Sequence, residues 1–236
     1  PFQLIQNLNA DMFSGYMHDA KPLNGGSNNS DYNMQDGWNS AMWTHVYSYI
    51  FPQIYQSENA TRDTHPALFG ITKILKVEVM HRVTDYYGPI IYRHFANAEK
   101  HYQPDTQKEV YYEFFNELDS AVVALIGYIE EKPESNGFAR FDILLDGKYS
   151  SWVKFANSLR LRLAMRLASI APDKARSEIE KIKENDYGFF ERGSEKVAVS
   201  TKSGYINPLG ELNLVWNETY MNASMESILT GYGDPR

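Results

Sequence analysis

The chain has 236 residues, a formal net charge of −7 and no cysteine. No apolar run approaches the roughly 18 residues of a membrane span. The acidic balance argues against nucleic acid as the main partner, because binding phosphates needs clustered lysine and arginine. The lack of cysteine excludes disulfide frameworks, zinc–thiolate sites and thiol nucleophiles. We therefore expect a globular protein that uses no cofactor and no metal.

Aromatic residues are unusually frequent, with 17 tyrosines, 12 phenylalanines and 4 tryptophans. Tyrosine combines a flat apolar face with a polar tip, and this combination matches the C–H faces and hydroxyl edges of sugar rings. A tyrosine-rich helical core explains many of these rings equally well. Composition alone leaves both interpretations open.

Helical spacing of apolar residues dominates from the start of the chain. The first predicted helix covers residues 4–17. A polar, glycine-containing segment over residues 24–37 follows and is typical of an exposed loop. A second helix starts near Trp38, and Pro52 predicts a kink or break in it because proline lacks a backbone N–H.

The next two helices have the clearest boundaries. The third follows residues 64–66, with proline in its first turn, and stops at residues 88–89, which are glycine and proline. The fourth begins with Thr106 and Glu109, which have the spacing of a capping box. Its apolar residues alternate steps of four and three, which predicts a narrow seam against a neighbouring helix: Tyr111, Phe115, Leu118, Val122, Leu125 and Ile129.

The second half continues with a fifth helix over residues 150–170 that is apolar nearly all round, which is typical of a helix packed between two others. A sixth, more polar helix covers residues 172–185. Residues 196–201 are expected to pair as a short strand, and residues 203–218 to form a loop. A last helix is predicted over residues 220–230. Helix pairs with an inner member indicate an all-α fold.

Three separated segments resemble one family. Residues 82–92 (RVTDYYGPIIY) resemble the helix end and following extended proline segment of the SusD/RagB proteins. Residues 152–166 (WVKFANSLRLRLAMR) resemble the long inner helix of that family. Residues 221–236 (MNASMESILTGYGDPR) resemble the segment that closes on Asp-Pro-Arg. The resemblance implies tetratricopeptide-like helix pairs with long irregular loops, arranged as a single helical domain over residues 1–236.

The resemblance also implies a location and partners. SusD/RagB proteins are surface-exposed lipoproteins of the bacterial outer membrane that cover a TonB-dependent transporter and deliver glycans to it, or peptides in some members. The lipid-bearing cysteine of the family is absent here, so membrane association is expected only through an anchor outside this sequence. Family chains continue beyond Asp-Pro-Arg, and we therefore expect the chain to be the N-terminal part of a longer protein.

No catalytic motif is present: neither a G-x-S-x-G elbow, a phosphate-binding glycine loop nor an H-E-x-x-H metal motif occurs. The sequence therefore indicates a protein that is not an enzyme. His81 and Asp85 are four residues apart on a helix and could share a metal, but a solvated or salt-bridged pair is the preferred interpretation. Arg162 and Arg166 share a face, and we expect both to pair with acids of a neighbouring helix.

The loop over residues 24–37 is the best candidate for ligand binding. Asp31, Tyr32, Asn33 and Trp38 would supply stacking rings and hydrogen-bonding groups, the combination that a sugar site needs. The alternative is a mobile linker with Trp38 in the core. A second candidate of the same type lies in the later loop, with the residues Tyr205, Asn207 and Trp216.

The leading hypothesis is a non-catalytic subunit that binds a glycan or oligosaccharide for a TonB-dependent uptake system. An all-helical glycoside hydrolase or lyase is one alternative, and product release from polysaccharides would favour it. A helical-repeat scaffold that binds only another protein is a second alternative. A binding screen that is blank for every glycan and peptide would favour the scaffold.

Overall fold

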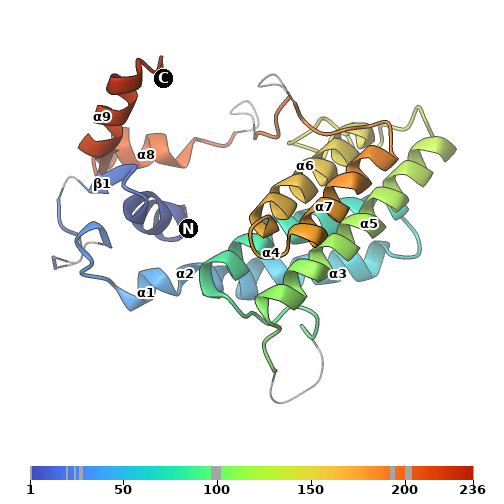
Figure 1. Ribbon diagram of the computed structural model, residues 1–236, viewed down its shortest axis with the longest axis horizontal. Coiled ribbons are helices and arrows are strands. Elements are labelled where there is room, and N and C mark those ends of the chain that lie inside the picture. Colours follow the sequence, from blue (N-terminus) through green and yellow to red (C-terminus); the bar gives the residue numbers. More distant parts are fainter. Residues whose placement is uncertain are drawn as a thin grey trace. The chain divides into compact units, whose positions relative to one another are not determined.

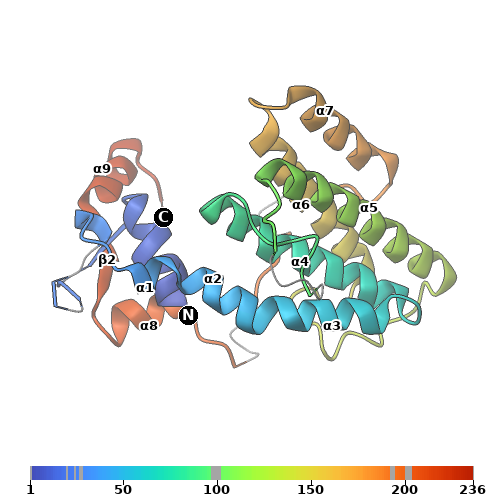
Figure 2. The same ribbon diagram turned by 90° about the horizontal axis from the view of Figure 1, so that it is seen from below.

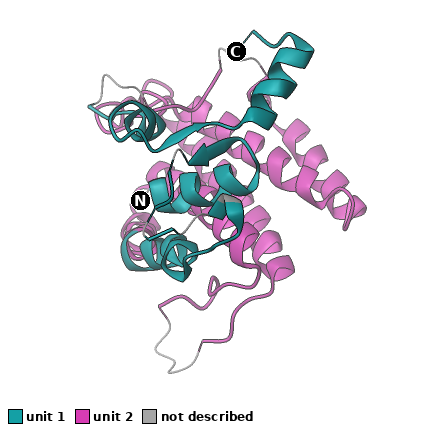
Figure 3. Ribbon diagram, turned by 90° about the vertical axis from the view of Figure 1, so that its left-hand side faces the viewer, with its two compact units in different colours: residues 1–49, 201–236 teal, residues 50–200 magenta. Residues whose placement is uncertain are grey.

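The computed structural model describes residues 2–19, 21–23, 25–26, 29–96, 102–191, 195–199 and 204–235. The described part is mostly helical and contains one two-stranded sheet (Figure 1). This confirms the all-α class. The chain divides into two compact units, residues 1–49 with residues 201–236 (unit 1) and residues 50–200 (unit 2), drawn in different colours in Figure 3.

Unit 1 is built from the two ends of the chain. Its sheet joins them, because β1 pairs antiparallel with β2, with Met17 opposite Met221 and Asp19 opposite Thr219. The side-chain amide of Asn7 also donates to the Thr219 hydroxyl at 3.1 Å. The elements of unit 1 are η1 (Gln3–Asp11), β1 (Met17–Asp19), η2 (Asn29–Asp31), α1 (Asp36–Asn39), α2 (Ala41–His45), α8 (Pro208–Leu214), β2 (Thr219–Met221) and α9 (Ala223–Tyr232).

Unit 2 is a stack of helices in which each member packs on its successor (Figure 1, Figure 2). The π-helical segment η3 (Val46–Ile50) leads into it. Such packing of consecutive helices agrees with the expected helix pairs. Its elements are α3 (Phe51–Thr61), α4 (Pro66–Tyr87), α5 (Gln107–Glu131), α6 (Tyr149–Leu167), α7 (Pro172–Lys181) and η4 (Ile182–Glu184).

The predicted helix boundaries of unit 2 are confirmed where cap chemistry was visible. Thr106 and Glu109 form the capping box of α5, and the hydrogen bonds from Thr106 lower the pKa of Glu109 to about 2. Gly88 follows α4 with a φ of 77°, a conformation that glycine adopts without strain. Residues 41–61 are helical without interruption, so Pro52 does not break the segment. Instead, the hydrogen bonding changes from π-helical to α-helical just before Pro52, which stands in the first turn of α3.

The inner helices differ from expectation in how much of their surface they bury. The narrow seam predicted for α5 is wrong, since α5 packs against both α4 and α6 and buries a broader face that adds Val110, Phe114 and Ala121. Contacts of α6 with α5 and α7 confirm that α6 is an inner helix. One side of it is nevertheless open, because Met165 is 59% exposed.

The last forty residues also differ from expectation. The predicted loop over residues 203–218 contains α8, whose start is capped by Asn207, the acceptor for the Leu209 amide at 3.0 Å. The last helix starts at Ala223 because residues 219–221 pair with β1 and Asn222 caps α9. Residues 196–199 form no strand, and the rest of that predicted strand lies outside the described residues.

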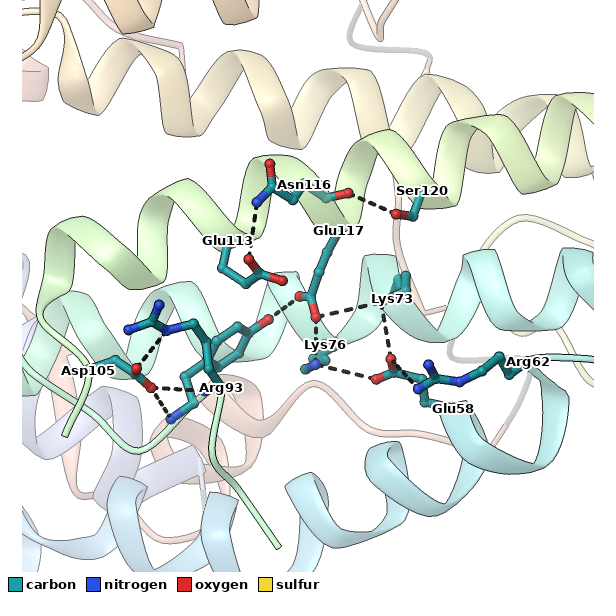
Figure 4. Close-up of polar contacts among 11 residues, drawn as sticks. Glu58, Arg62, Lys73, Lys76, Arg93, Asp105, Glu113, Asn116, Glu117 and Ser120 are labelled. Atoms are coloured by element: carbon teal, nitrogen blue, oxygen red, sulfur yellow. Dashed lines mark hydrogen bonds and ion pairs between the residues drawn. The ribbon is translucent and has the colours of Figure 1, made fainter. Parts of the chain in front are cut away.

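A network of charged side chains lies inside unit 2, between α3, α4 and α5 (Figure 4). Lys76 Nζ lies 2.5 Å from Glu117 Oε1 and 3.3 Å from Glu58 Oε2, and Lys73 Nζ lies 3.1 Å from Glu58 Oε1. The Tyr92 hydroxyl donates to Glu117. Two lysines thus balance two glutamates, which compensates for the cost of burying the four charges.

Candidate functional site

A cavity of about 540 Å³ lies within unit 1, between the turn after η1 and the start of α9. Gly15, with a φ of 70°, ends the first helical segment and turns the chain into β1. The Asn222 amide donates to the Tyr16 carbonyl at 3.0 Å and extends the β1–β2 pairing to the cavity. The side chains that carry chemistry in its wall are Phe13, Tyr16, His18, Asp31 and Asn222.

Aromatic rings at this cavity are accessible to a ligand. Tyr16 is 55% exposed, and Phe13 is exposed as well. The rings of Phe13 and Tyr32 lie 6.2 Å apart between centroids, at 31° to each other. Tyr32 has a φ of 58°, which is uncommon for a bulky residue and is seen in tight turns and at strained functional sites. The wall therefore combines exposed ring faces with a carboxylate, an imidazole and an amide.

A buried carboxyl group lies on the strand that borders the cavity. Asp19, at the end of β1, is only 3% exposed, and neither of its oxygens has a hydrogen-bond partner among the residues that the structure describes. Burial raises its pKa to about 6, and the negative charges of Glu218 and Asp31 act in the same direction, whereas His18 lowers it. Among the residues that the structure describes, no group of three or more acidic or histidine side chains is arranged to hold a metal ion.

The first predicted binding loop lies partly at this cavity. Asp31 lines the cavity, and the neighbouring Tyr32 packs near Phe13. The Asn33 side chain donates to the Gly26 carbonyl at 2.9 Å and thus closes the loop on itself. The structure therefore places Asp31 in the wall of the cavity, Tyr32 beside the wall residue Phe13, and Asn33 in a role within the loop.

The other predicted residues are not among the described lining residues of this cavity. Trp38 is half-buried in α1, and its carbonyl accepts from the Asn9 side chain at 3.3 Å. Tyr205 and Trp216 are exposed on either side of α8, and Asn207 caps that helix. These four positions remain predictions as binding residues.

Sequence reasoning missed Phe13, Tyr16, His18 and Asn222, because they meet only through the pairing of β1 with β2. The one signal in the sequence is the placement of two aromatic residues on either side of Gly15, at the end of a predicted helix. Nothing in the sequence shows that residues 222–228 would face them.

The charged residues singled out in unit 2 lie in three separate environments. Arg166 pairs with Asp85 at 2.8 Å, as expected, and the Tyr111 hydroxyl donates to Asp85 at 2.5 Å. His81 is fully buried, with Nδ1 3.1 Å from the Val77 carbonyl oxygen, and burial lowers its pKa. The expected solvated or salt-bridged pair of His81 and Asp85 is therefore wrong, since Asp85 contacts Arg166 and Tyr111 instead. Arg162 lies beside Glu78 in the wall of a different cavity.

The chain was compared with known proteins. The family model described as "Susd and RagB outer membrane lipoprotein" (SusD-like) matches residues 1–236. A SusD homologue from Bacteroides vulgatus ATCC 8482 is 45% identical with a TM-score of 0.92, over 100% of this chain and 47% of its own. A chitin-binding SusD homologue from Flavobacterium johnsoniae is 38% identical with a TM-score of 0.91, over 99% of this chain and 48% of its own. No curated protein matches the chain.

A more distant SusD-like protein from Bacteroides thetaiotaomicron VPI-5482 has 26% identity and a TM-score of 0.88, over 100% of this chain and 48% of its own. The chain thus spans about half the length of the solved structures that it matches. No helix among the described residues has the length and apolar character needed to cross a bilayer. The match of the family model over the whole chain, together with 45% identity to a solved homologue, shows that the chain belongs to the SusD-like family of outer membrane lipoproteins.

Proposed function

We propose that the chain is the glycan-binding part of a non-catalytic lipoprotein, and that the cavity of unit 1 holds sugar rings. The observation that carries the proposal is the presence of exposed aromatic rings and polar side chains in the wall of one cavity. The negative faces of Tyr16 and Phe13 attract the C–H groups of a pyranose ring. Asp31 accepts hydrogen bonds from hydroxyl groups, and the side-chain amide of Asn222 can donate them.

The relatives narrow the choice of the first ligand to test. The homologue from Flavobacterium johnsoniae is described as chitin-binding and is 38% identical to this chain. We therefore infer that oligomers of N-acetylglucosamine are the first candidates, with other neutral hexose oligomers next. An acidic glycan fits less well, because Asp31 and the chain's net charge of −7 would repel it.

We further propose that the full-length protein works with a TonB-dependent outer-membrane transporter, to which it passes the bound glycan. Membership of an outer membrane lipoprotein family supports the location. The lipid anchor would lie outside this sequence. Co-purification of the full-length protein with a TonB-dependent transporter of the same organism tests the partnership, and separate elution of the two proteins would contradict it.

Isothermal titration with a panel of neutral hexasaccharides tests the glycan site. Replacing Tyr16 with alanine should weaken binding about tenfold, because it removes one stacking ring. Tyr232→Ala is the matched control, since Tyr232 lies in the same unit, is exposed and is not among the described lining residues of the cavity. Release of shorter saccharides would instead indicate an enzyme, and no binding of any saccharide would favour a protein-binding scaffold.

A further inference from the structure

A second cavity, of about 580 Å³, lies within unit 2 and plays no part in the site proposed above. Its wall is made by the start of α4, the end of α5, the connection between α5 and α6, and the first residue of α6. These four segments meet at one end of the helix stack. All of the residues that line it belong to unit 2, so the cavity is defined by that unit alone.

Four aromatic rings form much of the wall of this cavity. Tyr128 and Tyr149 lie 5.1 Å apart between ring centroids, at 66° to each other. Phe138 and Phe141 come from the connection, and Phe141 is 63% exposed. Single exposed rings are common on protein surfaces, and the guanidinium carbon of Arg140 lies 4.5 Å from the Phe141 ring centroid. The notable feature here is that four rings gather at one cavity. The rings supply apolar faces to whatever occupies the cavity.

The connection between α5 and α6 is held in one conformation by Asp142. One carboxylate oxygen accepts from the amides of Leu144 and Leu145, each at 3.0 Å, and the other accepts from the Gly147 amide at 2.9 Å and from Trp152 Nε1 at 2.7 Å. Four donors to one buried carboxylate fix the loop firmly.

Close packing of the connection adds to this order. Gly147 has a φ of 73°, and a Cβ atom there would lie 2.5 Å from the Cα of Ala139. Two stretches of the connection therefore touch through the backbone, and only glycine permits this approach. Phe138 and Phe141 lie in this ordered connection, so the backbone that carries their rings is fixed before any ligand arrives. A preorganised wall lowers the entropy cost of binding.

The polar rim of the cavity carries no excess of either charge. Lys132 Nζ lies 3.7 Å from Glu131 and also 5.4 Å from the Tyr128 ring centroid. Thr64 and His65 contribute a hydroxyl and an imidazole, which lie 2.8 Å apart between Oγ1 and Nδ1. Paired charges attract neither an anion nor a cation strongly, whereas the hydroxyl, imidazole and carboxylate can all bond to ligand hydroxyl groups.

From these features we propose that the cavity is a second saccharide-binding subsite, which takes a sugar ring of a neutral glycan against Phe138, Phe141 and Tyr128. The inference rests on the proposed glycan binding, but it assigns binding to a different unit and to different residues. A neutral sugar ring stacks on aromatic side chains and hydrogen-bonds to polar groups through its hydroxyls. This cavity offers both kinds of group, and the charges in its wall cancel.

The test uses the 236-residue chain and the same panel of neutral hexasaccharides, starting with the hexamer of N-acetylglucosamine. Phe141→Ala and Phe141→Leu both remove the ring, and the leucine variant keeps apolar bulk. Each should weaken the second binding event about tenfold, or remove it from the titration. Met165→Ala is the control, because Met165 is also an exposed apolar residue of unit 2 but is absent from the described wall of this cavity. Circular dichroism checks that all three variants are folded.

Hydrogen exchange of residues 133–148 gives a second readout, and a bound saccharide should slow exchange there in the wild-type chain but not in the Phe141 variants. Unchanged titrations for the Phe141 variants, with binding lost in Tyr16→Ala, would overturn the second subsite and leave the proposed function intact. Loss of all binding in the Phe141 variants, with Tyr16→Ala unaffected, would support the subsite and contradict the cavity of unit 1. Absence of saccharide binding to the wild-type chain would overturn both.

Discussion

Burial of the Asp19 carboxyl links the stability of the folded chain to pH. In the folded chain its pKa is raised from an ordinary value of 3.8 to about 6, chiefly because the group is buried, and no described residue hydrogen-bonds to it. A raised carboxyl pKa means that the folded state binds the proton more tightly than the unfolded state does. Below pH 3.8 Asp19 is protonated in both states, and its contribution to the free energy of unfolding is fully present. That contribution is lost as the pH rises through about 6, where the buried carboxyl ionises.

Replacing Asp19 with asparagine should remove this dependence. The variant keeps the shape of the side chain but cannot ionise, so it should be more stable than the wild type at pH 8, by on the order of 2 kcal/mol. Near pH 4 the two proteins should be similar. Urea unfolding at both pH values measures the difference. An equal difference at pH 4 and pH 8 would show that the carboxyl of Asp19 does not titrate near 6.

Glu117 is the residue whose loss should damage the charged network of unit 2 most. It accepts from Lys76 and Tyr92, and its side chain is nearly buried. Glu117→Ala leaves two lysines facing a single glutamate in the interior and should cost about 3–5 kcal/mol. Glu180→Ala is the control, since its ion pair with Lys183 is exposed and should contribute at most about 0.5 kcal/mol. Denaturant unfolding compares them, and equal losses would contradict a structural role for the network.

At the scale of elements, the sequence predicted helices best where a cap or a proline marked the boundary. The capping box of α5 and the proline and glycine that bracket α4 carry their chemistry in neighbouring residues, so no tertiary contact is needed to read them. The strands β1 and β2 are three residues each and too short to show alternation. Their pairing depends on contacts across some 200 residues, and the cavity of unit 1 depends on that pairing.

The connection between α5 and α6 shows how one residue can order a whole segment. Asp142→Ala removes the acceptor for four donors, of which the Trp152 indole N–H and the amides of Leu145 and Gly147 are buried. We expect a loss of about 3 kcal/mol, because unpaired buried donors keep their full desolvation cost. Faster hydrogen exchange over residues 138–147 should accompany the loss.

Glu134→Ala provides the comparison for this prediction, as Glu134 lies in the same connection and is exposed. Its removal should change the free energy of unfolding by less than about 0.5 kcal/mol. A similar effect of both substitutions would mean that the Asp142 hydrogen bonds do not hold the connection together.

At the scale of the whole molecule, buried apolar residues are distributed unevenly between the two units. Among the described residues, those of unit 1 are Leu8, Met12, Met42, Val46 and Leu212. Unit 2 buries Phe51 of α3 and a much larger set of apolar residues on α4, α5 and α6. The family resemblance was carried by segments of both units, so the sequence predicted membership correctly. It could not show that the two chain ends form a unit of their own, since that depends on long-range pairing.

The uneven core leads to a prediction about folding. A fragment of residues 50–200 should keep the helical circular dichroism and cooperative thermal unfolding of the whole chain, because its apolar core and its charged network lie within it. Residues 1–49 joined to residues 201–236 by a short glycine–serine linker should unfold without a cooperative transition, since so few buried apolar side chains cannot offset the conformational entropy of the segment. A fragment of residues 50–200 that lacks a cooperative transition would mean that unit 2 needs unit 1 to fold, and the chain would then behave as one folding domain.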